Sequence, residues 1–320
     1  MSRNEIVGIV GSGFIGQSWA MLFASVGYKV HIYDVKAEQV SSALTNIKKQ
    51  LHILENSGML RGTLTAEQQF QCISAAASLK DCIKGAKYVQ ESVFEDLELK
   101  RKVFHEIDEV ADAHTVLASS TSCIVPSKFT ADLTHRENCI VAHPVNPPYY
   151  VPMVEVVPAP WTSKEVVTRT QAMMKEIGQS PVMFSREQPG FGLNRVQYAI
   201  LNECNNMVKS GILSAEDVDI LMKDGLGYRY AWMGPLETAH LNANGMEDYL
   251  NRYGPTMVSV SKDFAPVPLW TVPESQSLLS QMEQMVPEDK LPERREWRDA
   301  RLIALAKLKK EMKELEKSGK

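Results

Sequence analysis

The stretch Gly11-Ser-Gly-Phe-Ile-Gly16 decides the fold of this chain of 320 residues. It directly follows an apolar run rich in β-branched residues, Glu5 to Val10, and a helical pattern over Gln17 to Val26 comes next. Gly27 stops that helix, and a second apolar run, Lys29 to Asp34, ends in an acid. A strand, a glycine-rich turn, a helix and a second strand within about 30 residues predict a βαβ unit.

Three glycines and one acid in this unit indicate a dinucleotide site. Gly11 allows a tight turn, Gly13 lets backbone N–H groups approach a pyrophosphate, and Gly16 permits close packing of helix on sheet. Asp34 stands 18 residues after Gly16, where it would bind a ribose hydroxyl and repel a 2′-phosphate. The pattern predicts NAD rather than NADP; the alternatives are FAD, which uses the same glycines, and a turn without a ligand. The residues expected at the cofactor are Gly11, Gly13, Phe14, Ile15, Gly16 and Asp34.

Strand-like and helical stretches alternate through the first part of the chain, which implies a mostly parallel sheet covered on both faces. The further predicted strands are Tyr88 to Glu91, Thr115 to Ser119, Cys139 to Ala142, Met153 to Val157 and Pro181 to Phe184. The predicted helices between them are Ala37 to Glu55, Ala66 to Ala75, Leu97 to Val110 and Lys164 to Ile177.

After Gly190 the strand-like runs largely stop and long helical patterns take over. The predicted helices of this part are Leu193 to Ser210, Ala215 to Met222, Pro235 to Asn242 and Glu293 to Glu316. The sequence therefore predicts an α/β chain with two domains: a Rossmann-type, doubly wound sheet in residues 1–188 and an all-helical domain in residues 189–320.

Composition excludes several classes of partner. The 35 Lys and Arg against 39 Asp and Glu leave a formal charge of −4, without the basic excess that nucleic-acid binding needs. No apolar run approaches the roughly 18 residues of a membrane span. Five single cysteines without metal-ligand spacing predict a reduced, metal-free protein. Because the first strand begins close to Met1, we expect no signal or transit peptide, and a cytoplasmic protein.

His143 and Glu155 are the first catalytic candidates. His143 ends a predicted strand and is followed by a proline-rich loop, and doubly wound folds bind their ligands outside the carboxyl ends of the strands. Glu155 lies in an apolar strand, where a carboxylate is costly unless it is paired. His143 would be that partner. The alternative is a loop histidine whose hydrogen bonds serve only the structure.

Four other polar residues have open roles. Ser122 closes a strand with a hydroxyl that could bond a substrate or cap the helix near Pro126. Asn194 opens the helical part, where it would bind substrate, cap the helix or bridge the domains. Glu95 and Lys100 flank the start of a helix, and by themselves they would be an ordinary surface pair.

Six stretches together resemble the 3-hydroxyacyl-CoA dehydrogenase family, in order and spacing, from about residue 5 to 245. They are GSGFIG with Asp34, Glu95 to Lys100, Ser119 to Ser122, His143-Pro-Val-Asn-Pro147, Glu155 and Pro189 to Arg195. The resemblance implies that His143 is a general base, that Glu155 orients it, and that Ser122 and Asn194 hold the reacting oxygen. It also implies that Glu95 and Lys100 contact NAD and its nicotinamide-side ribose, and that the helical domain forms a homodimer.

Two departures from the family pattern bear on cofactor and substrate. Ser120 stands where acyl-CoA enzymes usually have Asn, which puts that cofactor contact in doubt. Arg229-Tyr-Ala-Trp232 replaces part of their Gly-Tyr-Pro-Met-Gly-Pro run, and arginine suits a compact carboxylate because its fork forms two charge-assisted hydrogen bonds.

Within the family, three stretches are most similar to those of members that oxidise a free sugar acid: His143 to Val157, Gly225 to Glu237 and Arg295 to Asp299. We therefore expect NAD-dependent oxidation of the C3 hydroxyl of a small 3-hydroxy acid such as L-gulonate. Arg229 would bind the substrate's carboxylate; the alternatives are an exposed arginine without a ligand and an internal salt bridge with an acid near Glu237. The alternatives are a 3-hydroxyacyl-CoA substrate and a structural role of the lens-crystallin type.

Overall fold

The computed structural model describes residues 3–318, in which a single eight-stranded sheet runs in the order β3-β2-β1-β4-β5-β6-β7-β8. Neighbouring strands are parallel except for the antiparallel pair β6 and β7. The strands are β1 (Ile6–Val10), β2 (Lys29–Tyr33), β3 (Ile73–Ala75), β4 (Ala86–Glu91), β5 (Val116–Ser119), β6 (Cys139–Pro144), β7 (Met153–Pro158) and β8 (Ser180–Met183). The strand order reverses between β1 and β4, which confirms the predicted doubly wound sheet and opens a crevice at the carboxyl ends of these strands.

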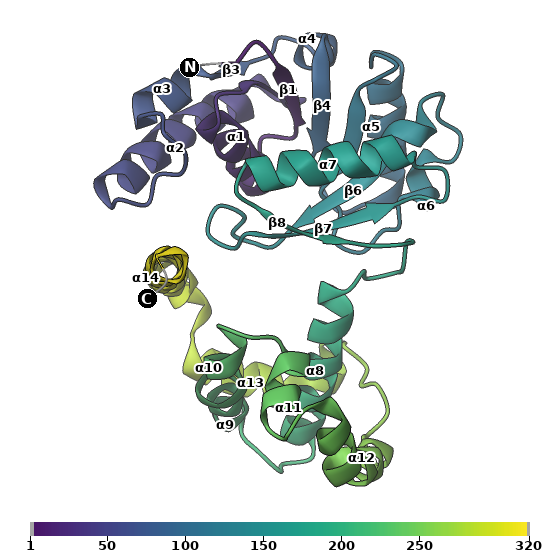
Figure 1. Cartoon of the computed structure of the whole chain (residues 1–320), viewed down its shortest axis with the longest axis vertical. Coiled ribbons are helices and arrows are strands. Elements are labelled where there is room, and N and C mark those ends of the chain that lie inside the picture. The colour runs from purple at the N-terminus through teal and green to yellow at the C-terminus, as the bar shows by residue number, and fades with distance from the viewer. Residues whose placement is uncertain (1–2, 319–320) are drawn as a thin grey trace. The chain divides into compact units, whose positions relative to one another are not determined.

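Helices cover both faces of the sheet, because side chains along each buried strand alternate between two hydrophobic cores. On one face α1, α2 and α7 pack over Val7 and Ile9, and on the other α4, α5 and α6 pack over Val10 and Val89. Figure 1 shows α7 crossing in front of the strands. The helices are α1 (Phe14–Ser25), α2 (Ala37–Asn56), α3 (Ala66–Gln71), α4 (Leu79–Ile83), α5 (Leu97–Asp108), α6 (Ser127–Thr130) and α7 (Lys164–Glu176).

The predicted helix over Ala66 to Ala75 is wrong in its last residues. α3 begins with a capping box at Thr65 but ends at Gln71, and Ile73–Ala75 is the edge strand β3. Val30 of β2 pairs with Ile73, so the edge of the sheet supplies the hydrogen bonds that decide the conformation. Helix α4 was not predicted, since five residues are too few to show a helical period.

The later part of the chain is helical, as predicted. Its elements are α8 (Leu193–Lys209), α9 (Ala215–Ile220), the π-helical turn η2 (Leu221–Leu226), α10 (Gly227–Tyr230), α11 (Pro235–Leu241), α12 (Met246–Asp263), α13 (Gln276–Met285) and α14 (Leu291–Lys317). Helices α12 and α13 were not predicted. Gly254-Pro255 is a helix-breaking pair by sequence, yet α12 continues through it with Pro255 inside the helix.

The described residues form two compact units, residues 3–194 with 299–318, and residues 195–298. The second unit has a small core of its own around Val208, Ala215 and Val218. The division lies close to the predicted boundary after residue 188, and helix α14 contributes to both units. The assignment of residues 189–320 to one separate domain stays a prediction. No helix within residues 3–318 is long and apolar enough to cross a membrane.

Candidate cofactor and catalytic site

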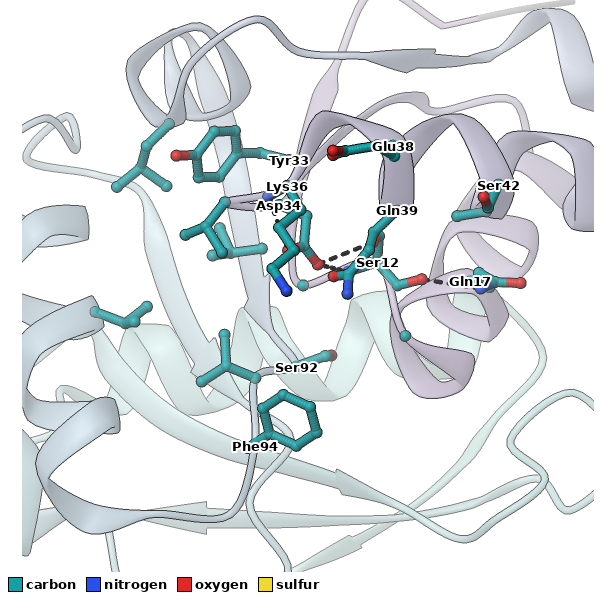
Figure 2. Close-up of a pocket in the computed structure, with 18 of the residues that line it drawn as sticks. Ser12, Gln17, Tyr33, Asp34, Lys36, Glu38, Gln39, Ser42, Ser92 and Phe94 are labelled. Carbon is teal, nitrogen blue, oxygen red and sulfur yellow. Dashed lines mark hydrogen bonds between the residues drawn. The ribbon is translucent and has the colours of Figure 1, made fainter.

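A cavity of about 600 Å³ opens at the carboxyl ends of β1, β2 and β4, beside the point where the strand order reverses. Figure 2 shows its polar wall around Ser12, Gln17 and Asp34, with Ser92 and Phe94 on another side. The lining also includes Gly11, Gly13, Tyr33, Val35, Lys36, Glu38, Gln39 and Ser42. In doubly wound folds this is the place where dinucleotides bind.

The glycines have the geometry that the sequence predicted for them. Gly11 has φ +105°, and a Cβ built on it would lie 2.6 Å from the carbonyl oxygen of Ser92. A Cβ on Gly16 would collide with the carbonyl oxygen of Gly11, so helix and turn pack too closely for any side chain. Gly13 caps α1, and no atom lies within 4 Å of a Cβ built there. This open backbone at a helix N-terminus fits the approach of a pyrophosphate.

Asp34 follows β2 at the rim of the cavity and is held by the glycine turn. Its Oδ2 accepts hydrogen bonds from the backbone N–H of Ser12 at 2.9 Å and from the Ser12 hydroxyl at 2.8 Å. Within residues 3–318, its Oδ1 accepts a single long bond, 3.4 Å, from the Lys36 N–H. The carboxylate therefore keeps acceptor capacity at the cavity, as binding of a ribose hydroxyl requires.

Phe14 and Ile15 are not among the described residues that line this cavity, and a contact of their backbone with the cofactor stays a proposal. The Phe14 ring is exposed and borders a second, smaller cavity of about 190 Å³ together with Tyr149 and Tyr150. The Ile15 side chain packs against the hydrophobic core. Both residues lie in the first turn of α1, where backbone N–H groups have no partner within the helix.

Lys100 is directed into the protein, where only 1% of the residue is exposed. Its Nζ donates to both carboxylate oxygens of Glu91, at 3.0 and 3.1 Å, and lies 3.5 Å from Oε2 of Glu95. Oε1 of Glu95 accepts from the Thr121 hydroxyl at 2.7 Å and from the Ser122 N–H at 2.9 Å. The three charged groups thus connect β4 and α5 to the loop after β5. A direct contact of Glu95 or Lys100 with the cofactor stays a proposal.

His143 and Glu155 lie opposite each other on β6 and β7 and are both buried. The distance from His143 Nδ1 to Glu155 Oε2 is 2.7 Å, and Glu155 Oε1 accepts from the N–H groups of Gly192 and Leu193, each at 2.8 Å. Burial by itself raises the pKa of Glu155. The hydrogen bonds from His143, Leu193 and Gly192 outweigh that effect and hold its pKa below the ordinary value of 4.5.

The charge on Glu155 determines the tautomer of His143. An ionised carboxylate only accepts hydrogen bonds, so Nδ1 carries the proton that joins the pair, and the lone pair lies on Nε2. No group in residues 3–318 forms a hydrogen bond with Nε2. The imidazole is therefore oriented to accept a proton at a nitrogen that the fold leaves available.

Ser122 and Asn194 come together, as the sequence suggested. The Asn194 Nδ2 donates to the carbonyl oxygen of Ser122 at 2.8 Å and to the Cys123 sulfur at 3.2 Å. The Ser122 hydroxyl makes no hydrogen bond within the part of the chain described. The observed role of the Asn194 amide is to hold the loop that presents Ser122, and the binding of substrate by either side chain stays a proposal.

Arg229 lies in α10, within the second compact unit, and its side chain is exposed. Among residues 3–318 no acid forms an ion pair with it, which excludes the internal salt bridge near Glu237 and leaves the exposed arginine as the alternative to a substrate contact.

Sequence reasoning missed Glu91 and the polar side chains beside it. Glu91 ends β4, is fully buried, and accepts from Lys100, from the Ser119 hydroxyl at 2.5 Å and from the Val93 N–H at 2.6 Å. A signal was present, because a carboxylate at the end of a strand that should be buried needs a partner, as Glu155 does. The family resemblance places the partner, Lys100, at the cofactor, whereas in the structure its Nζ binds Glu91.

The fold, the glycine turn, the free acceptor on Asp34 and the cavity at the switch point together define an NAD-binding dehydrogenase fold. Residues 6–188 match the 3-hydroxyacyl-CoA dehydrogenase NAD-binding domain, and residues 190–270 match the C-terminal domain of the same enzymes. The chain belongs to the 3-hydroxyacyl-CoA dehydrogenase family, whose cofactor is NAD.

Known proteins similar to this chain include both crystallins and enzymes. The lambda-crystallin homolog of Bos taurus is 50% identical over 308 residues, 96% of each chain. An L-carnitine dehydrogenase of Oceanobacillus iheyensis is 33% identical over 78% of this chain and 81% of its own. The solved structure of an NAD-dependent dismutase, 5-formyl-3-hydroxy-2-methylpyridine 4-carboxylic acid 5-dehydrogenase, has a TM-score of 0.80 and 25% identity, and it covers 98% of this chain and 99% of its own.

Proposed function

We propose that this protein oxidises the C3 hydroxyl of a free 3-hydroxy acid, of the L-gulonate type, to the corresponding 3-keto acid, with NAD as hydride acceptor. The observation that carries this proposal is the buried pair of His143 and Glu155, which are joined at 2.7 Å and leave Nε2 of His143 available. The nicotinamide of bound NAD supplies the hydride chemistry.

The protein's own residues move the proton in this proposal. His143 removes the hydroxyl proton at Nε2, while Glu155 stabilises the positive charge that develops on the imidazole. The two backbone N–H groups at Gly192 and Leu193 keep Glu155 in place, so the base is held in position before substrate binds. General-base catalysis of this kind contributes about 10²- to 10⁴-fold. The Ser122 hydroxyl would bond the reacting oxygen, on a loop that Asn194 holds.

Arg229 supports a free carboxylic acid as the substrate. Its guanidinium is exposed and has no acidic partner in the described residues, so it is available for a carboxylate. The similar L-carnitine dehydrogenases are named for a hydroxy acid without CoA, which supports the same substrate class. A 3-hydroxyacyl-CoA, after which the family is named, is the competing substrate.

The test is to measure NADH formation by the purified protein with L-gulonate, 3-hydroxybutyrate and 3-hydroxybutyryl-CoA in parallel. We expect the highest kcat/KM with L-gulonate. A higher kcat/KM with 3-hydroxybutyryl-CoA would show that the substrate is an acyl-CoA rather than a free acid. If none of the three substrates yields NADH, the proposed dehydrogenase activity is wrong.

Arg229→Met gives a sharper test of the carboxylate contact. Losing a charge-assisted hydrogen bond costs about 1.5 to 3 kcal/mol, or roughly 10- to 150-fold in affinity. We expect KM for L-gulonate to rise by that factor while the Kd for NADH stays within about twofold. Arg252→Met, which removes another exposed arginine of the same compact unit, is the control. An unchanged KM in Arg229→Met would exclude this arginine as the carboxylate's partner.

We also propose that two copies associate through the helical part of the chain, in the cytoplasm. Helix α12 has no buried residue, and it exposes an apolar stripe of Leu250, Tyr253, Met257 and Val260 at helical spacing. Exposed apolar surfaces of this kind mark association sites. The five cysteines, all without disulfides, favour a reducing compartment.

A further inference from the structure

A group of polar side chains lies behind the wall of the cofactor cavity, and Ser120 is at its centre. The Ser120 hydroxyl oxygen is 3.1 Å from Nε1 of Trp19, 2.7 Å from Nε2 of Gln90 and 2.9 Å from the hydroxyl oxygen of Ser92. The Tyr88 hydroxyl donates to Oε1 of Gln90 at 2.7 Å. None of these side chains takes part in the proposed proton transfer to His143.

The chemistry of the neighbours determines where each proton lies. An indole N–H only donates, so Trp19 donates to Ser120. Gln90 also donates to Ser120, because the same amide nitrogen lies 3.3 Å from the carbonyl oxygen of Ala142, which only accepts. Both lone pairs of the Ser120 hydroxyl are then occupied. Its own proton must be donated to the remaining neighbour, Ser92.

This arrangement determines where the hydroxyl proton of Ser92 points. Since its hydroxyl oxygen accepts from Ser120, the Ser92 proton points away from Ser120. Ser92 makes no other side-chain hydrogen bond within residues 3–318, and it lines the cofactor cavity. Its backbone N–H donates to the carbonyl oxygen of Val10 at 2.7 Å, directly beside the glycine turn, so its position is fixed at the switch point between β1 and β4. Figure 2 shows Ser92 on the cavity wall near Phe94.

We infer that the Ser92 hydroxyl is an oriented hydrogen-bond donor to an oxygen atom of the bound dinucleotide. Because the proton of Ser120 occupies one of the three tetrahedral positions on the Ser92 oxygen, the Ser92 proton is confined to the other two, and part of its rotational freedom is already lost before the cofactor binds. Donors that accept another hydrogen bond are also polarised by it, which strengthens the bond that they give. The inference rests on NAD as the cofactor and is independent of the substrate.

The test compares Ser92→Val with Ser92→Thr, since these two side chains have nearly the same shape and only threonine carries the hydroxyl. The Kd for NADH is measured from NADH fluorescence with each purified protein. A neutral hydrogen bond of about 0.5 to 1.5 kcal/mol corresponds to roughly 2- to 12-fold. We therefore expect NADH to bind Ser92→Val about 2- to 12-fold more weakly than Ser92→Thr, and more weakly still if the acceptor is a phosphate oxygen.

Ser92→Ala, compared with the unmodified protein, is the second variant, because it introduces no new methyl group near Gly11. Circular dichroism and the unfolding midpoint show whether each variant is folded. The inference is wrong if Ser92→Val and Ser92→Thr bind NADH with equal Kd, or if Ser92→Ala binds it as tightly as the unmodified protein. Neither result would bear on the proposed reaction. Failure of the unmodified protein to bind NADH would instead contradict the cofactor on which both proposals depend.

Discussion

At the scale of single residues, two buried carboxylates organise the candidate site. Glu155 holds His143 and the N–H groups at the start of α8, and Glu91 holds Lys100 and Ser119. Each is buried in the sheet, where water cannot solvate it, so each requires several donors. Such groups restrict the site to one arrangement, because any other would leave a charge unpaired.

Removing the proposed base tests the most important residue. His143→Ala should lower kcat by at least about 10²-fold, in line with loss of a general base, and should leave NADH affinity nearly unchanged. Steady-state kinetics and NADH titration measure the two effects separately. An active His143→Ala protein would show that another group accepts the proton.

The lowered pKa of Glu155 predicts a pH dependence of stability. Its carboxylate is preferred in the folded state, so its contribution is complete above its ordinary pKa of 4.5 and is lost as the pH falls through the lower folded value. Glu155→Gln should therefore reduce the free energy of unfolding at pH 7, and the difference from the unmodified protein should shrink below pH 4.5. Denaturant titrations across this range measure it. A difference that is independent of pH would contradict the assignment.

At the scale of elements, α5 is attached to the sheet by the buried Lys100. Removing one partner of a buried ion pair costs about 3 to 5 kcal/mol, since the other charge stays buried without compensation. Lys100→Met should lower the free energy of unfolding by that amount. Lys102→Met, two residues further along the same helix and exposed, should change it by less than about 0.5 kcal/mol.

The double variant Glu91→Gln with Lys100→Met provides the complementary measurement. Once neither charge is present, part of the lost stability should return, because no unpaired charge remains in the core. If Lys100→Met unfolds as easily as Lys102→Met, the proposed contribution of the buried pair to stability is wrong.

At the scale of the whole molecule, the apolar stripe of α12 predicts association. We expect sedimentation velocity to give twice the chain mass of 35.8 kDa. Met257→Glu places a charge in the middle of the stripe and should shift the protein toward the monomer. Ser259→Glu changes the opposite side of the same helix and is the matched control. A monomeric unmodified protein, or a dimer unaffected by Met257→Glu, would contradict this interface.

The sequence alone determined the doubly wound fold, the cofactor and the partners His143 and Glu155. These depend on local patterns: strand periodicity, glycines at fixed spacing, and a carboxylate in an apolar strand that must be paired. The helical nature of the later part was equally evident, although α12 was hidden by Gly254-Pro255.

Only the tertiary structure decided the rest. Residues 73–75 became a strand because β2 offered an unpaired edge. Lys100 is directed inward because Glu91, nine residues earlier in the chain, ends a neighbouring strand. Ser120 lies among Trp19, Gln90 and Ser92 because helix α1 meets the ends of strands β4 and β5 there. The physical reason is common to all three cases. Buried hydrogen bonds and ion pairs between distant segments depend on which side chains share a place in the fold, and no local pattern in the sequence records that.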